Sequence, residues 1–135
     1  MRKKLLIVDD NANLVEAIKE GLRCDYSVKG VYDASSALQE INRTRYDCVI
    51  LDVGLPDMSG MDLLKILRKN TVSFDIPVII FTVRGEYENM IAGIKKGADK
   101  YLTKSTGLAE LKVNVKALLR RIKYDLARKN APNRI

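Results

Sequence analysis

The chain has 135 residues, which suits one α/β domain and is too short for two domains of roughly 100 residues each. Hydrophobic residues make up 47% of it, and no apolar run approaches the roughly 20 residues of a membrane span, so we expect no contact with a membrane. The formal net charge is +7, and the absence of histidine excludes histidine-based general base catalysis and leaves any metal to carboxylates.

The apolar pattern predicts five strands and five helices in strict alternation. Unbroken apolar runs at 5–8, 48–51 and 78–81 are typical of strands covered on both faces. The segment 27–32 contains Lys29 and Gly30 and fits an edge strand better, and 100–103 supplies the last short strand. Apolar residues three or four positions apart predict helices at 11–23, 35–42, 61–69, 87–96 and from about 108 onward, with Gly97 as a left-handed residue after the fourth.

Polar residues fall where the predicted strands end. Asp9 and Asp10 follow the first strand, Asp52 follows the third, Thr82 ends the fourth and Lys104 follows the fifth. Strict alternation predicts right-handed crossovers and a doubly wound parallel sheet, which binds ligands at the carboxyl ends of its strands. We therefore expect these five residues to converge at one edge of the sheet, although Asp10 alone is equally well explained as a helix cap.

Three carboxylates with no histidine or arginine between them repel one another, and a divalent cation removes that repulsion. Mg²⁺ takes one or two carboxylates together with waters and phosphate oxygens, so a phosphate site is implied. A carboxylate can attack a phosphoryl group while a metal ion and an ammonium neutralise the phosphoryl oxygens. Lys104 is placed to supply the ammonium.

In this order and strand context, the residues resemble the receiver domain of two-component response regulators. The resemblance is carried by Val8-Asp9-Asp10, by the segment from Ile50 to Gly60, by Phe81-Thr82 and by 97–104. It covers 3–123 and leaves 124–135 as a basic helical extension or tail, of which 131–135 is expected to be disordered. It implies a flavodoxin-like fold, with five strands in the order 2-1-3-4-5 and five flanking helices.

The resemblance also implies a role for each site residue. Asp52 resembles the phosphoacceptor, and Lys104 and Thr82 resemble the lysine and hydroxyl that bond the phosphoryl group. The expected Mg²⁺ ligands are Asp9, Asp10, Asp52 and the backbone carbonyl of Gly54. Tyr101 resembles the aromatic residue whose rotamer follows the threonine, although a simple packing role for this tyrosine is the alternative.

The family's partners are expected here as well. A histidine kinase or phosphotransfer protein would supply the phosphoryl group, and a downstream effector, or an output domain outside this sequence, would receive the signal. Such a chain is a signalling domain that takes part in its own phosphorylation and dephosphorylation, and not an enzyme with a separate substrate. A cytoplasmic location is expected, with Cys24 and Cys48 as reduced thiols.

Some positions depart from the family pattern. Ser105 stands where a proline, often after a cis peptide, usually follows the lysine, so the loop is expected to be either trans or strained. Val83 replaces a small residue, which predicts slower dephosphorylation through restricted access. A homodimer is left open, but Met90, Lys100 and Asn114 stand at positions of the ionic network in the dimer of winged-helix regulators and do not match its pattern. A linker coiled coil is the alternative.

Three other interpretations explain the sequence less well than a phosphorylated receiver domain does. A phosphatase of the haloacid dehalogenase type needs an acid two residues after its aspartate nucleophile, where this chain has Gly54. A phosphorylation-independent receiver stays open because of Ser105. The segment 112–135 has eight lysines and arginines against one acid, yet a solvated helix face is the favoured interpretation and direct nucleic-acid binding is not expected.

Overall fold

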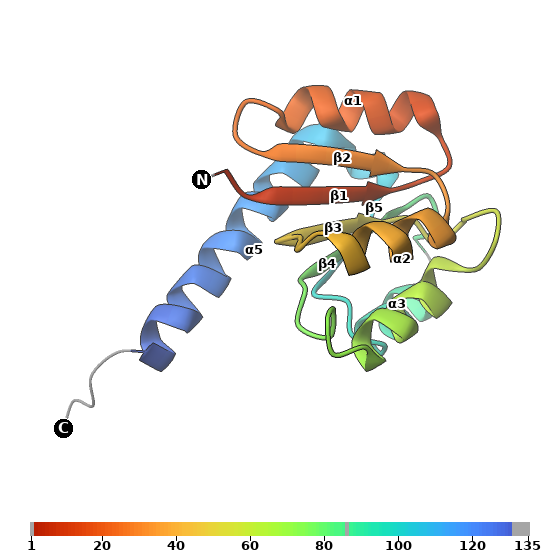
Figure 1. Cartoon of the computed structure of the whole chain (residues 1–135). Helices are drawn as coiled ribbons and strands as arrows, with labels where there is room; N and C mark the ends of the chain where they lie inside the picture. Colours follow the sequence, from red (N-terminus) through yellow and green to blue (C-terminus); the bar gives the residue numbers. More distant parts are fainter. Residues whose placement is uncertain (1, 86, 131–135) are drawn as a thin grey trace.

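The computed structural model describes residues 2–85 and 87–130. It has one five-stranded sheet in the order β2-β1-β3-β4-β5, and every neighbouring pair is parallel (Figure 1). The strands are β1 Lys4–Val8, β2 Ser27–Val31, β3 Cys48–Leu51, β4 Val78–Thr82 and β5 Lys100–Thr103. The helices are α1 Ala12–Leu22, α2 Ala34–Arg43, α3 Gly60–Lys69, α4 Tyr87–Lys95 and α5 Gly107–Asn130, with a 3₁₀ turn, η1, over Lys104–Thr106. The predicted doubly wound fold and its strand order are confirmed.

Two apolar cores lie on opposite faces of the sheet because successive strand side chains point to opposite sides. Leu6 and Val8 of β1 belong to the core under α2, α3 and α4, whereas Leu5 and Ile7 belong to the core under α1 and α5. The same alternation continues through β3 and β4, whose residues are buried throughout. The side chains of β3 and β4 are therefore all covered. Polar groups of these two segments can reach solvent only beyond the ends of the strands.

The two edge strands differ from the central ones as the sequence predicts. β2 has an exposed or half-exposed residue at every position except Val31, and all of β5 is half-buried. The turn after α4 contains Gly97, whose φ of +110° confirms the predicted left-handed residue. The peptide bonds of the described segments are all trans, which includes the bond before Ser105.

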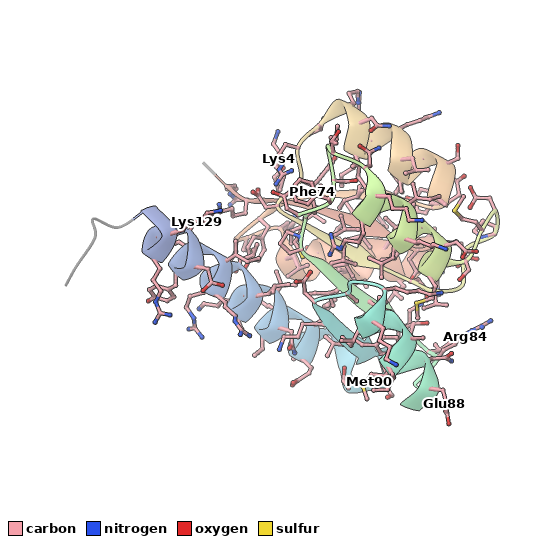
Figure 2. All side chains as sticks on the ribbon, turned by 90° about the horizontal axis from the view of Figure 1, so that it is seen from below. Lys4, Phe74, Arg84, Glu88, Met90 and Lys129 are labelled. Atoms are coloured by element: carbon pink, nitrogen blue, oxygen red, sulfur yellow. The ribbon has the colours of Figure 1, made fainter. Side chains whose placement is uncertain are left out.

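Helix α5 is longer than the sheet it covers. It runs past the amino ends of the strands, so that Lys129 lies at the opposite end of the molecule from Arg84 and Glu88 (Figures 1 and 2). Ile122 is the last residue of α5 that packs against the core, and the residues from Lys123 to Lys129 are exposed. The tail predicted at 131–135 lies outside the described residues.

None of the helices in the part of the chain described is long and apolar enough to cross a membrane. The thiols of Cys24 and Cys48 are both free, Cys24 at the surface and Cys48 buried in β3.

Candidate functional site

The carboxyl ends of the strands bring the predicted polar residues to one edge of the sheet. Asp9 and Asp52 directly follow the parallel neighbours β1 and β3, and their amides continue the sheet by donating to the carbonyls of Val31, at 3.2 Å, and Val8, at 2.9 Å. Thr82 is the last residue of β4, and Lys104 follows β5. The convergence expected from the sequence is therefore present in the structure.

Three carboxylates form a compact cluster at this edge. One oxygen atom each from Asp9, Asp10 and Asp52 lies within 4.8 Å of the other two. Asp9 and Asp52 are buried, being 3% and 7% exposed, whereas Asp10 is open to solvent. This arrangement gives the cluster a buried floor and an accessible rim, through which an ion or a phosphate group can enter.

Lys104 supplies the ammonium of the cluster. Its Nζ lies 2.7 Å from Oδ2 of Asp9 and 3.1 Å from Oδ2 of Asp52, so it bridges the two buried carboxylates. Burial by itself would lower the pKa of Lys104, but its hydrogen bonds to Asp9 and Asp52 and their charges outweigh burial and raise that pKa. One firmly protonated lysine against three carboxylates leaves the cluster short of positive charge.

The two carboxylate oxygens of Asp52 have different surroundings. Oδ2 accepts the hydrogen bond from Lys104, whereas Oδ1 is buried and has no hydrogen-bond partner among the described residues. A buried oxygen without a partner costs about 1–3 kcal/mol, which a cation or a new bond at that oxygen would remove. With oxygen donors only, this unpartnered atom and the excess of negative charge, the cluster fits Mg²⁺.

The surroundings of Asp9 disfavour the ionised form of its carboxyl group. Burial raises the pKa of its carboxyl group, and the nearby charge of Asp52 acts in the same direction. Hydrogen bonds from Lys104 and from the Asn11 amide, which donates to Oδ1 at 2.9 Å, act against burial without cancelling it. In the metal-free domain, the ionised form of Asp9 therefore lowers the free energy of unfolding.

The two predicted switch residues both bond to the backbone of Arg84, a residue whose part in the site no sequence pattern predicted. Thr82 is 1% exposed, and its Oγ1 accepts a long hydrogen bond of 3.4 Å from the Arg84 amide. The Tyr101 hydroxyl donates to the Arg84 carbonyl. A Cβ on Gly93 would lie 2.9 Å from Cδ2 of Tyr101, so α4 comes close to the tyrosine ring only because this residue is glycine.

The loop between β3 and α3 is held close to Asp52. A Cβ on Gly60 would lie only 2.1 Å from the Asp52 carbonyl oxygen, so the start of α3 can approach this backbone only with a glycine. Ser59 caps the helix by accepting from the Met61 amide at 3.1 Å. A serine before an apolar helical run signals the cap, but the close approach at Gly60 depends on contacts that the sequence pattern does not contain.

The positions that depart from the family pattern do not displace Lys104. The trans bond before Ser105 lies within the turn η1, and the Ser105 hydroxyl lies 2.7 Å from the hydroxyl of Thr103 at the end of β5. Of the two predicted alternatives for this loop, the trans form is observed, and Lys104 still reaches both carboxylates. Val83 is 76% exposed, and its effect on dephosphorylation stays a prediction.

The geometry agrees with what known proteins show. Residues 5–116 match the family model described as the response regulator receiver domain. This chain is a member of that family. Relatives of the receiver domain include the transcriptional regulatory protein PrrA of Mycobacterium leprae, which is 36% identical over 119 residues, 87% of this chain and 50% of PrrA. The phosphate regulon transcriptional regulatory protein PhoB of Escherichia coli is 35% identical over 123 residues, 90% of this chain and 54% of PhoB.

The chain thus spans about half the length of the curated relatives it matches. Solved receiver domains superpose over nearly their whole length. That of the Francisella response regulator 1452 has a TM-score of 0.84 and 35% identity over 90% of this chain and 99% of its own. A CheY-like receiver domain protein from Methanospirillum hungatei has a TM-score of 0.86 and 27% identity over 93% of this chain and 99% of its own.

The raised pKa of Asp9 predicts a pH-dependent gain from Asp9→Asn in the metal-free domain. Below the ordinary carboxyl pKa of 3.8 the residue is protonated in the folded and unfolded chain, so its charge has no influence on stability. As the pH rises through the raised pKa, ionised Asp9 destabilises the folded wild type but has no counterpart in the variant. The free energy of unfolding of the variant, relative to wild type, should therefore increase with pH.

Urea unfolding in the presence of a chelator, between pH 3.5 and 8, measures this difference. Asp125→Asn, which removes an exposed acid of α5, controls for the change in net charge. A difference for Asp9→Asn that shrinks as the pH rises would contradict the electrostatic account of the cluster.

Proposed function

We propose that this receiver domain accepts a phosphoryl group on Asp52 from a histidine kinase or phosphotransfer protein, in a Mg²⁺-dependent reaction, and then switches its signalling surface. The observation that carries the proposal is the environment of Asp52. Its Oδ1 is buried and unpartnered while Lys104 holds Oδ2 at 3.1 Å, so one oxygen is fixed and the other has no hydrogen bond to give up when it bonds to phosphorus. Family membership supports the same reaction.

The proposed step is a displacement at phosphorus. Oδ1 of Asp52 forms the new bond to phosphorus, the bond from phosphorus to the donor nitrogen breaks, and the electron pair leaves with the donor. The product is an acyl phosphate on Asp52. Lys104 lies close enough to Oδ2 to pair with a phosphoryl oxygen as charge gathers there, and the loose transition state of phosphoryl transfer makes such pairing the main contribution of the protein.

We assign the Mg²⁺ ligands to Asp9, Asp10, Asp52 and the backbone carbonyl of Gly54. When bound, Mg²⁺ would neutralise phosphoryl oxygens and offset the repulsion among the carboxylates. The grouping of the three carboxylates supports their part in this assignment. The role of Gly54 rests on the family pattern and on its place two residues after Asp52 in the same loop.

For the switch, we propose that Thr82 bonds the phosphoryl group and that Tyr101 responds. Within residues 2–85 and 87–130, the Thr82 hydroxyl has one long hydrogen bond, of 3.4 Å, from the Arg84 amide. A charged phosphoryl oxygen would replace it because hydrogen bonds to charged acceptors are stronger. Tyr101 donates to the carbonyl of the same Arg84. A movement of Arg84 would therefore displace the Tyr101 side chain, which extends from β5 toward α4. The loop after β4 would thus have two states, one with Thr82 bonded to Arg84 and one with Thr82 bonded to the phosphoryl group.

We propose 3–123 as the receiver domain and 124–135 as a basic extension. The exposure of α5 after Ile122 supports a boundary there. PrrA and PhoB are named as transcriptional regulators, so an output domain or a downstream effector that controls transcription is the partner we favour. A homodimer is compatible with the exposed Tyr124 and Leu126, and the two free thiols are compatible with a cytoplasmic location.

Incubation with acetyl phosphate and Mg²⁺, followed by intact-mass measurement, tests the acceptor directly. Wild type should gain one phosphoryl group and Asp52→Asn none, because an amide is not a nucleophile at phosphorus. Lys104→Ala should label roughly 10²–10³-fold more slowly, the usual cost of one charge-stabilising donor.

Lys100→Ala serves as the matched control, since Lys100 is also on β5 but at its opposite end. An unlabelled wild type, or equal labelling of Asp52→Asn, would rule out Asp52 as the acceptor. Labelling of Lys104→Ala at the wild-type rate would remove the role of the ammonium.

Thr82→Ala separates the switch from phosphorylation itself. The variant keeps Asp52 and Lys104, so it should still become labelled, while the relay to Arg84 is lost. Amide hydrogen exchange should show that phosphorylation changes protection of the loop after β4 in wild type and in Thr82→Ser, which keeps the hydroxyl, but not in Thr82→Ala. A wild-type response of labelled Thr82→Ala would show that Thr82 is not the relay.

A further inference from the structure

The base of the loop from Asp52 to Ser59 is hydrogen-bonded within the loop and to the first residue of α3. The Val53 carbonyl accepts from the amides of Leu55, at 3.2 Å, and Gly60, at 2.8 Å, and Gly54 forms an isolated antiparallel bridge with Ser59. These bonds close the base of the loop. Farther out, Leu55 and Met58 are half-buried and pack against the core, but the bonds at the base do not reach another element beyond α3.

Asp57 joins the outer part of this loop to a different element. Its Oδ1 accepts from the Ala34 amide at 2.9 Å, and its Oδ2 accepts from the Ser35 amide at 2.9 Å. Both oxygens of one carboxylate therefore hold the first turn of α2, 22 and 23 residues away along the chain. Among the described residues, the hydrogen bonds from the outer part of the loop, 54–58, to other elements all come from this side chain.

Helix α2 already has a cap of its own. Asp33 occupies the N-cap position in an extended conformation, and its side chain accepts from the Ser36 amide at 2.7 Å. Asp33 satisfies only one of the unpaired amides of the first helical turn, and Asp57 satisfies two more from a loop that is distant in the sequence. The two amide bonds lower the pKa of Asp57, which keeps its carboxylate ionised at the positive end of the helix dipole.

We propose that Asp57 is a positioning residue that ties the loop after β3 to α2 and thereby holds the Gly54 carbonyl in place for Mg²⁺. The inference rests on the proposed function, since it assigns a partner to one ligand of that metal site. Gly54 is exposed, and a Cβ there would meet nothing within 4 Å, so no other element packs against that side of the residue. Its bridge to Ser59 restrains it within the loop, and the bonds of Asp57 restrain the loop relative to α2. A ligand ordered in advance in this way binds at a lower entropic cost.

Magnesium binding measured by calorimetry, at a temperature where every protein is folded, distinguishes positioning from capping. Asp57→Ala should bind Mg²⁺ roughly tenfold more weakly than wild type, the usual size of an effect on a residue that orients a ligand. Asp33→Ala is the matched control, because it removes one charge and one capping carboxylate from the same helix start but leaves the loop anchored. Its affinity for Mg²⁺ should be that of wild type.

Asp57→Asn gives a second test that keeps the shape of the side chain. It retains one acceptor oxygen and should fall between wild type and Asp57→Ala in affinity, whether or not the alanine variant is well folded. Wild-type affinity in Asp57→Asn and Asp57→Ala, or an equal loss in Asp33→Ala, would overturn the positioning role. Failure of wild type itself to bind Mg²⁺ would instead contradict the proposed function, so the two failures are distinguishable.

Discussion

The structure depends on an electrostatic imbalance at one edge of its sheet. Two buried carboxylates share the ammonium of Lys104, and a third carboxylate lies beside them at the rim. The remaining negative charge raises the cost of the folded state until a cation completes the site. Lys104 is placed to keep the two buried acids together, and the unpartnered Oδ1 of Asp52 gives the incoming group an atom to bind.

The rest of the fold holds the charged residues of this edge in position. The central strands are buried on both faces, so they set the positions of Asp9 and Asp52 through the rigidity of a packed sheet. The segments that follow the strands need contacts of their own. Gly60 brings α3 against the backbone of Asp52, Asp57 anchors the loop to α2, and Arg84 connects the Thr82 hydroxyl with Tyr101.

Sequence reasoning succeeded where the signal is local. Apolar runs define the strands and helical spacing defines the helices, which is enough to place Asp9, Asp52 and Lys104 at strand ends. It did not predict the bonds of Asp57 to α2 or the role of Arg84, because those depend on which backbone groups face each other after folding. Ser105 shows the same limit, since two loop conformations fit the sequence and only the structure selects the trans form.

A titration of the ¹⁵N-labelled domain with Mg²⁺, followed by NMR of its amide groups, measures whether the carboxylates at the sheet edge bind the cation. We expect saturable shifts gathered at the residues after β1 and β3, including Asp9, Asp10, Asp52 and Gly54, with weaker effects near Lys104 and none along the extension of α5. We also expect Asp52→Asn to weaken this response. Shifts that do not saturate, or that gather away from the carboxyl edge of the sheet, would contradict cation binding by these carboxylates.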